Sequence, residues 1–167
     1  MAKQSAGVLL YRKRGGAIEI FLVHPGGPYW SGKDLGSWSI PKGEFTAEEA
    51  PLSAARREFE EETGHEISGD FVPLAPIKQP GGKVVHAFAV EGDCDAQAIE
   101  SNRFSLEWPP RSGHYREFPE VDRAGWFSVP LAKQKIAKGQ IGFIDELLLR
   151  IPSVSQPSVP QRETISD

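Results

Sequence analysis

The sequence is poor in sulfur, with one cysteine, Cys94, and one methionine among its 167 residues. A single cysteine excludes an intrachain disulfide. The same scarcity of cysteine favours a reducing, cytoplasmic setting. Cys94 lies in the polar run EGDCDAQ, and we do not expect a catalytic thiol there.

Long apolar runs and an excess of positive charge are also absent. No run approaches the roughly 18 apolar residues of a membrane-spanning helix, and residues 1–4 do not begin like a signal peptide. We therefore expect no membrane partner. Lys and Arg number 19 against 23 Asp and Glu, a balance that gives no general attraction for nucleic acid, and we expect no stable nucleic-acid partner. A nucleotide ligand would then need a local basic pocket and a metal.

The stretch from Gly43 to Gly64 (GEFTAEEAPLSAARREFEEETG) predicts a loop, one helix and a second loop. Thr46, with Glu49 three residues later, has the pattern of a helix N-cap and capping box, which would place acidic residues in the first helical turn. Gly64 is a natural residue at which the helix would stop.

Three carboxylates share one arc of this predicted helix, because Glu58, Glu61 and Glu62 are related by steps of three and four residues. Carboxylate oxygens in such a group are suitable ligands for a hard dication such as Mg²⁺. A glutamate-rich face can equally be a solvated surface.

The spacing distinguishes these alternatives. The order Gly43, Glu49, Arg57-Glu58-Phe59, Glu61-Glu62, Gly64 resembles the Nudix box, G-x5-E-x7-R-E-U-x-E-E-x-G-U, at all seven fixed positions. A chance match in a chain of this length is on the order of one in a million. The last U position departs from the pattern, because His65 stands where an aliphatic residue is usual.

The resemblance assigns roles to residues in and before the box. Glu58 and Glu62, helped by Glu61, would bind Mg²⁺ or Mn²⁺, and Glu58 could also act as the base. Arg57 would orient carboxylates, pairing with Glu61 and, across the loop, with Glu49. The lead-in Trp38-Ser39-Ile40-Pro41-Lys42 is similar to a W-x-x-P-K-G segment of the family. It implies that the Lys42 carbonyl completes the metal site, while the Lys42 side chain could meet a phosphate oxygen.

Two loops supply candidates for substrate binding. Residues 25–37 are rich in Gly and Pro and contain Trp30, which could stack on a base or cap the core. Residues 109–116 contain Arg111, Tyr115 and Arg116, which suit phosphates and a base, or form a solvated loop. By resemblance, a glutamate in the segment that follows can bind metal or act as the base. Glu117 and Glu120 are the candidates, with a surface role as the alternative.

The remaining pattern predicts an α/β fold. Residues 5–12 and 17–24 indicate neighbouring strands, residues 83–90 and 103–108 two further strands, and residues 130–137 and 143–151 two helices. The resemblance implies a Nudix-like α/β/α sandwich with a mixed sheet and the box as a loop-helix-loop. We expect a Nudix domain at 1–151 and a Pro/Ser-rich, disordered tail at 152–167.

The resemblance implies a divalent-metal-dependent hydrolase that cleaves a diphosphate bond in a small nucleotide. The lead-in is similar to that of dinucleoside polyphosphate hydrolases and of enzymes that hydrolyse oxidised nucleoside triphosphates. Gly81 and Gly82 stand where the former often have a tyrosine. Pro80, fifteen residues after His65, is weakly similar to ADP-ribose hydrolases. An ADP-ribose or nucleotide-sugar pyrophosphatase and a non-catalytic nucleotide-sensing domain are the alternatives, with RNA decapping a lesser one.

Overall fold

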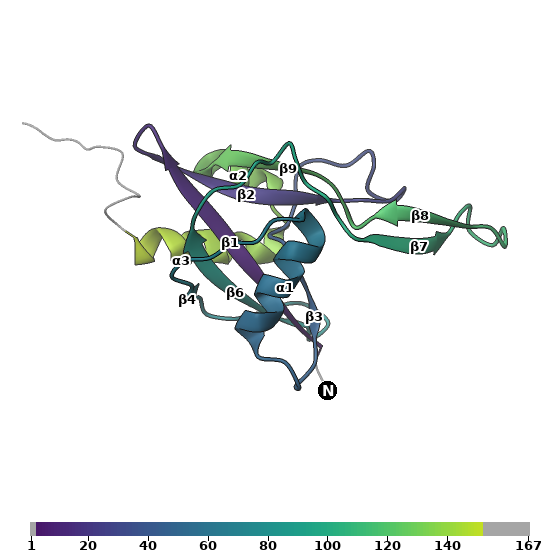
Figure 1. Ribbon diagram of the computed structural model, residues 1–167, viewed down its shortest axis with the longest axis horizontal. Helices are drawn as coiled ribbons and strands as arrows, with labels where there is room; N and C mark the ends of the chain where they lie inside the picture. Colours follow the sequence, from purple (N-terminus) through teal and green to yellow (C-terminus); the bar gives the residue numbers. More distant parts are fainter. Residues whose placement is uncertain (1–2, 152–167) are drawn as a thin grey trace, which may run out of the picture.

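The computed structural model describes residues 3–151, so the segment 152–167, predicted as a disordered tail, lies outside the described residues. Three strands precede the first helix, six more strands follow it, and the other helices come last in the described residues (Figure 1). The strands are β1 (Gln4–Arg14), β2 (Ala17–Pro25), β3 (Lys42–Phe45), β4 (Val72–Pro73), β5 (Ile77–Lys78), β6 (Val84–Glu91), β7 (Arg103–Glu107), β8 (Tyr115–Pro119) and β9 (Val121–Ser128). The helices are α1 (Pro51–Thr63), α2 (Val129–Lys135), the short 3-10 helix η1 (Lys138–Gln140) and α3 (Ile141–Arg150). No helix in this part of the chain is long and apolar enough to cross a membrane.

The main sheet is mixed and has seven strands, in the order β4-β6-β1-β2-β9, with β3 also pairing with β1 and β5 with β6. β1 and β6 are parallel, and the other pairs in this sheet are antiparallel. The predicted neighbouring strands form a β1–β2 hairpin. Gly15 and Gly16, both with positive φ, make its turn, a conformation that glycine adopts without steric cost.

Each face of the sheet is covered by helix, which confirms the predicted sandwich. Because side chains alternate along a strand, Phe21 and Val23 of β2 pack with Phe59 of α1 on one face. Ile20 and Leu22 point to the other face and pack with Phe143 and the rest of the α2 and α3 core. Helix α1 and helix α3 accordingly lie on opposite sides of the strands in Figure 1.

Helix α1 begins later than the sequence predicts. Its N-cap is Ala50 and its first residue Pro51, so the Thr46 capping box is wrong and no acidic residue lies in the first turn. Thr46 instead belongs to a preceding turn, in which its carbonyl accepts the Glu49 N–H at 3.1 Å. The residue before a proline avoids the helical region, and Ala50 is extended. Gly64 ends the helix in the left-handed region, as predicted.

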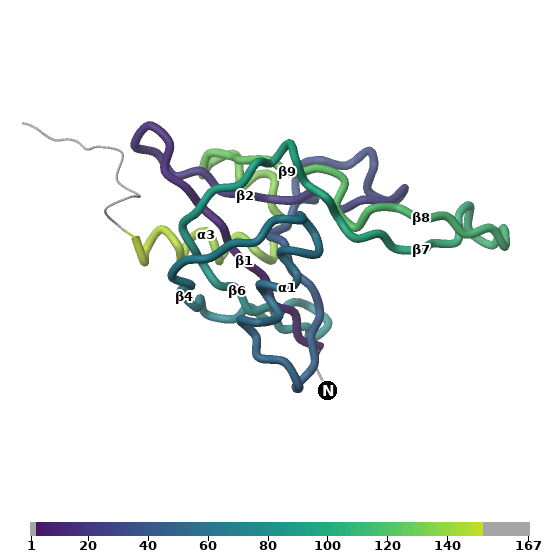
Figure 2. Tube along the Cα trace, in the orientation of Figure 1, coloured from purple at the N-terminus to yellow at the C-terminus, as the bar shows by residue number. Residues whose placement is uncertain are grey.

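Strands β7 and β8 form a separate hairpin that projects from the body of the molecule (Figures 1 and 2). Tyr115 and Arg116 are the first residues of β8, which corrects the prediction that they belong to a loop. The loop after β2 lies beside this hairpin, and the rings of Tyr29 and Trp108 meet edge to face with centroids 5.3 Å apart.

Candidate active site

Helix α1 packs so closely on β3 that one of its carboxylates lies beneath a glycine. Glu58 is only 8% exposed, and a Cβ atom at Gly43 would overlap its carboxyl group. Because Gly43 does not have a positive φ, what an alanine would change here is space: its methyl group would force the Glu58 carboxyl group to move. Burial is the largest effect on the Glu58 carboxyl group and raises its pKa, while the hydrogen bond from Arg57 acts against it.

Arg57 connects the turn before α1 to the carboxylates of the helix. Its Nε and Nη2 atoms donate to the two carboxylate oxygens of Glu49 at 2.8 and 2.9 Å. Its Nη1 donates to Glu58 at 2.9 Å and to Glu61 at 3.2 Å. The predicted pairs with Glu49 and Glu61 are both present. Because Glu49 precedes the helix, its side chain can reach back to this guanidinium, whose pKa is raised chiefly by the Glu49 hydrogen bond.

Glu62 faces a small cavity from the same helix. The cavity has a volume of about 160 Å³, and Glu62, Lys42, Pro25, Glu120 and Val121 are among the residues that line it. Burial, followed by the negative charges of Glu58 and Glu120, raises the pKa of Glu62 to about 8, against an opposing effect from Lys42. Burial also raises the pKa of Glu120, and the charge of Glu61 adds to this effect. Glu120 thus belongs to the same electrostatic group as the box carboxylates.

These residues fit a hard divalent cation by chemistry and by charge. Carboxylate and main-chain oxygens are the donors that Mg²⁺ and Mn²⁺ prefer. The raised pKa values of these carboxyl groups indicate that nearby positive charge does not balance their negative charge. Among the residues that line the small cavity, Lys42 is the one cation beside Glu62. Within residues 3–151, no three His, Cys, Asp or Glu side chains already converge as a ready ligand cage. Binding a cation would therefore require the glutamate side chains to rotate toward it.

A larger cavity of about 830 Å³ adjoins the outer side of α1. Arg57 and Glu61 line it from the helix, and Asn102, Arg103 and Asp122 line it from the opposite side. Nothing in the local sequence pattern of these last three residues relates them to the box, so they could not be predicted as neighbours of it. Val121 lines both cavities and is a boundary between them.

The structure separates the other predicted residues from this cluster. Glu117 lies on β8 with a side chain 70% exposed and 3.6 Å from Arg103. Tyr115 is 68% exposed, Arg116 lies over the Phe118 ring, and Arg111 lies in the loop at the end of the hairpin. None of these four residues lines either cavity.

Trp30 lies in the loop after β2 and is 41% exposed. It lines neither cavity. The structure thus brings together Lys42, Arg57, Glu58, Glu61, Glu62 and Glu120 among the predicted site residues.

Solved structures share this fold. The structure superposes on a C. elegans Ap4A hydrolase in a binary complex with a TM-score of 0.60 at 17% identity, covering 89% of this chain and 98% of that chain. It superposes on the NUDIX domain of Shewanella oneidensis NrtR, complexed with ADP ribose, with a TM-score of 0.63 at 14% identity, covering 90% of this chain and 89% of that chain. At these identities the likeness establishes the fold alone.

Sequence comparison adds a curated relative and a family. An octanoyltransferase from Myxococcus xanthus is 35% identical over 101 residues, which are 60% of this chain, and the chain spans 25% of that relative's length. A family model described as the NUDIX domain matches residues 1–147. Given this match, the mixed sheet between helices and the box residues gathered on α1, the chain belongs to the Nudix family.

Proposed function

We propose that the chain is a hydrolase that uses Mg²⁺ or Mn²⁺ to cleave a diphosphate bond in a small nucleotide. The observation that carries this proposal is the group of carboxylates Glu58, Glu62 and Glu120, in which burial and like charge raise each pKa. Such a group is costly for a protein unless a cation binds to it.

The residues of α1 would have different roles. Glu58 and Glu62 would hold the cation, with Glu61 and the main-chain carbonyl of Lys42 as further oxygen donors. Arg57 fixes the carboxylates of Glu58 and Glu61 by hydrogen bonds. A bound dication would neutralise the diphosphate and lower the pKa of a water molecule. The Lys42 side chain, which lines the small cavity, would meet a phosphate oxygen.

Glu120 is the stronger of the two later glutamates as general base. It faces the small cavity together with Glu62, whereas Glu117 points into solvent beside Arg103. A carboxylate with a raised pKa is a better proton acceptor once it is ionised. Glu58 is the alternative base, because burial raises its pKa as well.

A nucleoside triphosphate or a dinucleoside polyphosphate is the substrate we favour. A cavity of about 160 Å³ suits phosphate groups, so a base would lie in the cavity of about 830 Å³ or beside the loop that carries Trp30. Arg111, Tyr115 and Arg116 would then contact only a substrate long enough to reach the β7–β8 hairpin. The likeness to an Ap4A hydrolase supports this choice, and the likeness to a domain complexed with ADP ribose supports an ADP-ribose or nucleotide-sugar substrate as the alternative.

Acyl transfer through a cysteine is not proposed, although one relative is an octanoyltransferase. Burial, with the charge of Asp93, raises the pKa of Cys94 to about 12, so its thiolate is scarce at neutral pH. A cytoplasmic location stays a prediction from the single cysteine.

A substrate panel tests the proposal. Nucleoside triphosphates, dinucleoside polyphosphates, ADP-ribose and nucleotide sugars are incubated with the protein and Mg²⁺ or Mn²⁺, and the products are resolved by ion-exchange chromatography. We expect cleavage of a diphosphate bond that EDTA abolishes. Binding without cleavage across the whole panel, measured by calorimetry, would instead identify a non-catalytic nucleotide-sensing domain.

A further inference from the structure

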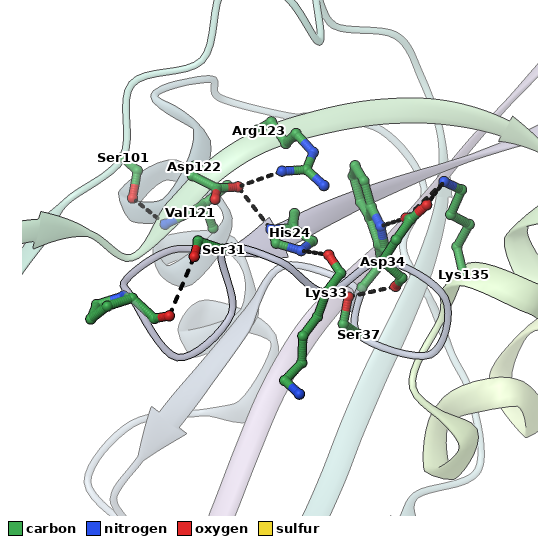
Figure 3. Close-up of polar contacts among 12 residues, drawn as sticks. His24, Ser31, Lys33, Asp34, Ser37, Ser101, Val121, Asp122, Arg123 and Lys135 are labelled. Carbon is green, nitrogen blue, oxygen red and sulfur yellow. Dashed lines mark hydrogen bonds and ion pairs between the residues drawn. The ribbon is translucent and has the colours of Figure 1, made fainter.

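A fully buried histidine, His24, lies near the end of β2 between Val23 and Pro25, which line the small cavity. Its Nδ1 atom lies 2.9 Å from a carboxylate oxygen of Asp122 on β9. Its Nε2 atom lies 2.7 Å from the main-chain carbonyl oxygen of Lys33, in the loop after β2 (Figure 3). The indole of Trp38 covers the imidazole edge to face, with ring centroids 5.2 Å apart.

Both atoms that His24 contacts are hydrogen-bond acceptors. A carbonyl oxygen always accepts, and an ionised carboxylate only accepts. A neutral imidazole carries one N–H, so either tautomer would leave a nitrogen lone pair facing an oxygen. Only the doubly protonated ring donates at both positions, and a buried contact left without a donor is costly.

The charges around the ring agree with this form. From β9, Asp122 faces Nδ1, and Arg123 lies 3.8 Å from the same Asp122 oxygen. From the loop, Asp34 is bound by Lys135 of α2 through both carboxylate oxygens, at 2.8 and 2.9 Å. The charge of Asp34 is therefore balanced by Lys135. Asp122 lies closer to His24, at 2.9 Å, than to Arg123, at 3.8 Å.

The two bonds join segments that border the candidate active site. Lys33 belongs to the loop that carries Trp30, and Asp122 follows Glu120 by two residues. The Gly26 N–H donates to the Glu120 carbonyl at 2.9 Å. Pro25 and Val121, the neighbours of His24 and Asp122 in the chain, line the small cavity.

We propose that His24 is a positioning residue, whose doubly protonated ring fastens the Trp30 loop and the start of β9 to the end of β2. Loss of one ring proton would release the Lys33 carbonyl and loosen the loop, while the sheet stays intact. The consequence for catalysis rests on the proposed hydrolase function, but the state of the ring and the loop does not.

Nuclear magnetic resonance of the full chain, labelled with ¹⁵N in histidine, reports the ring directly. Long-range ¹H–¹⁵N spectra are recorded at neutral pH, and a His24→Gln variant assigns the signals among the four histidines. At neutral pH we expect protons on both ring nitrogens of His24. In the His24→Gln variant we expect the amide protection factors of Lys33 and Gly36 to fall about tenfold, which corresponds to the loss of one hydrogen bond from a charged group.

Two variants isolate the cause. Asp122→Asn keeps the size and an acceptor oxygen but removes the charge, so we expect one ring proton to be lost at neutral pH and the loop amides to lose protection about tenfold. His86→Gln is the matched control, because that ring contacts the side chain of Gln4 far from the loop in sequence. In this control, the protection factors of the loop amides should equal those of the unmodified protein. The Leu74 amide, which donates to the Ala87 carbonyl in the sheet, should stay protected in every variant.

A single N–H on His24 at neutral pH would overturn the proposal, as would amide protection of the loop in Asp122→Asn equal to that of the unmodified protein. These measurements use no substrate. A protein that hydrolyses nothing yet gives both signals would count against the proposed function and leave the role of His24 standing.

Discussion

Replacing Glu62 by glutamine tests the central electrostatic argument without requiring any knowledge of the substrate. Burial and the charges of Glu58 and Glu120 raise the pKa of Glu62 from the ordinary 4.5 to about 8. Between these values the metal-free folded protein keeps a proton on Glu62 that the unfolded chain has released. The folded state binds more protons there, so the free energy of unfolding falls as pH rises from about 4.5 to about 8.

The size of the effect follows from this pKa difference. One pKa unit corresponds to about 1.4 kcal/mol, so the free energy of unfolding falls by at most about 5 kcal/mol over this pH range. Glutamine is neutral and similar in shape, so Glu62→Gln removes this cost above about pH 8. Lys42 loses a nearby negative charge in the variant, which offsets part of the gain. We expect the metal-free variant to be about 2 kcal/mol more stable than the unmodified protein at about pH 9.

Urea unfolding at several pH values, in EDTA and in Mg²⁺, provides the assay. We expect Mg²⁺ to stabilise the unmodified protein at high pH and to have little effect on Glu62→Gln, because a ligand stabilises only the state that binds it. The same variant should lose most metal-dependent hydrolysis while staying folded. Glu66→Gln is the control, since Glu66 is exposed just beyond α1 and should match the unmodified protein.

Two results would refute the reasoning. One is a Glu62→Gln variant that is no more stable than the unmodified protein at high pH without metal, which would mean that Glu62 is not an uncompensated buried charge. The other is equal protection of both proteins by Mg²⁺ together with full activity of the variant, which would remove Glu62 from the metal site.

Three further predictions concern the neighbours of this residue. Arg57→Lys should lower kcat/KM about a hundredfold, since an ammonium cannot replace the two-pronged contact of the guanidinium, whereas Arg56→Lys should change little. Gly43→Ala should lower metal-dependent activity, because the added methyl group displaces the Glu58 carboxyl group from its place beside β3. Glu120→Gln should slow turnover about 10²- to 10⁴-fold and remove the rise of rate with pH on the acidic side, whereas Glu117→Gln should do neither.

Steady-state kinetics over a pH range measures all three, with circular dichroism as the test of folding. Gly139→Ala is the control for the glycine substitution, because the nearest atom to its added Cβ, in Gln79, lies at an ordinary 3.5 Å. Equal losses in Arg56→Lys and Arg57→Lys would show that the contacts of the Arg57 guanidinium with the glutamates are not the cause of the loss. A Glu117→Gln variant slower than Glu120→Gln would reverse the assignment of the base.

Much of helix α1 could be predicted because its information is local. Glu58, Glu61 and Glu62 share an arc of any helix that includes them, and Arg57 reaches Glu61 by helical spacing alone. The alternating patterns of β1 and β2 likewise determine which side chains meet each helical layer. The start of α1 was wrong because the Thr46 pattern competes with Pro51, and a proline excludes a helical residue before it.

The choice between Glu117 and Glu120 could not be made from the sequence, because it depends on where one strand ends and the next begins. Glu117 lies within β8 and follows the projecting hairpin, whereas Glu120 stands between β8 and β9, where the chain returns to the main sheet. The bond from Gly26 to the Glu120 carbonyl fixes that junction, and it joins residues 94 positions apart. The position of Glu120 therefore depends on a contact between distant segments. A motif read along the chain contains the carboxylates of α1 but not such contacts.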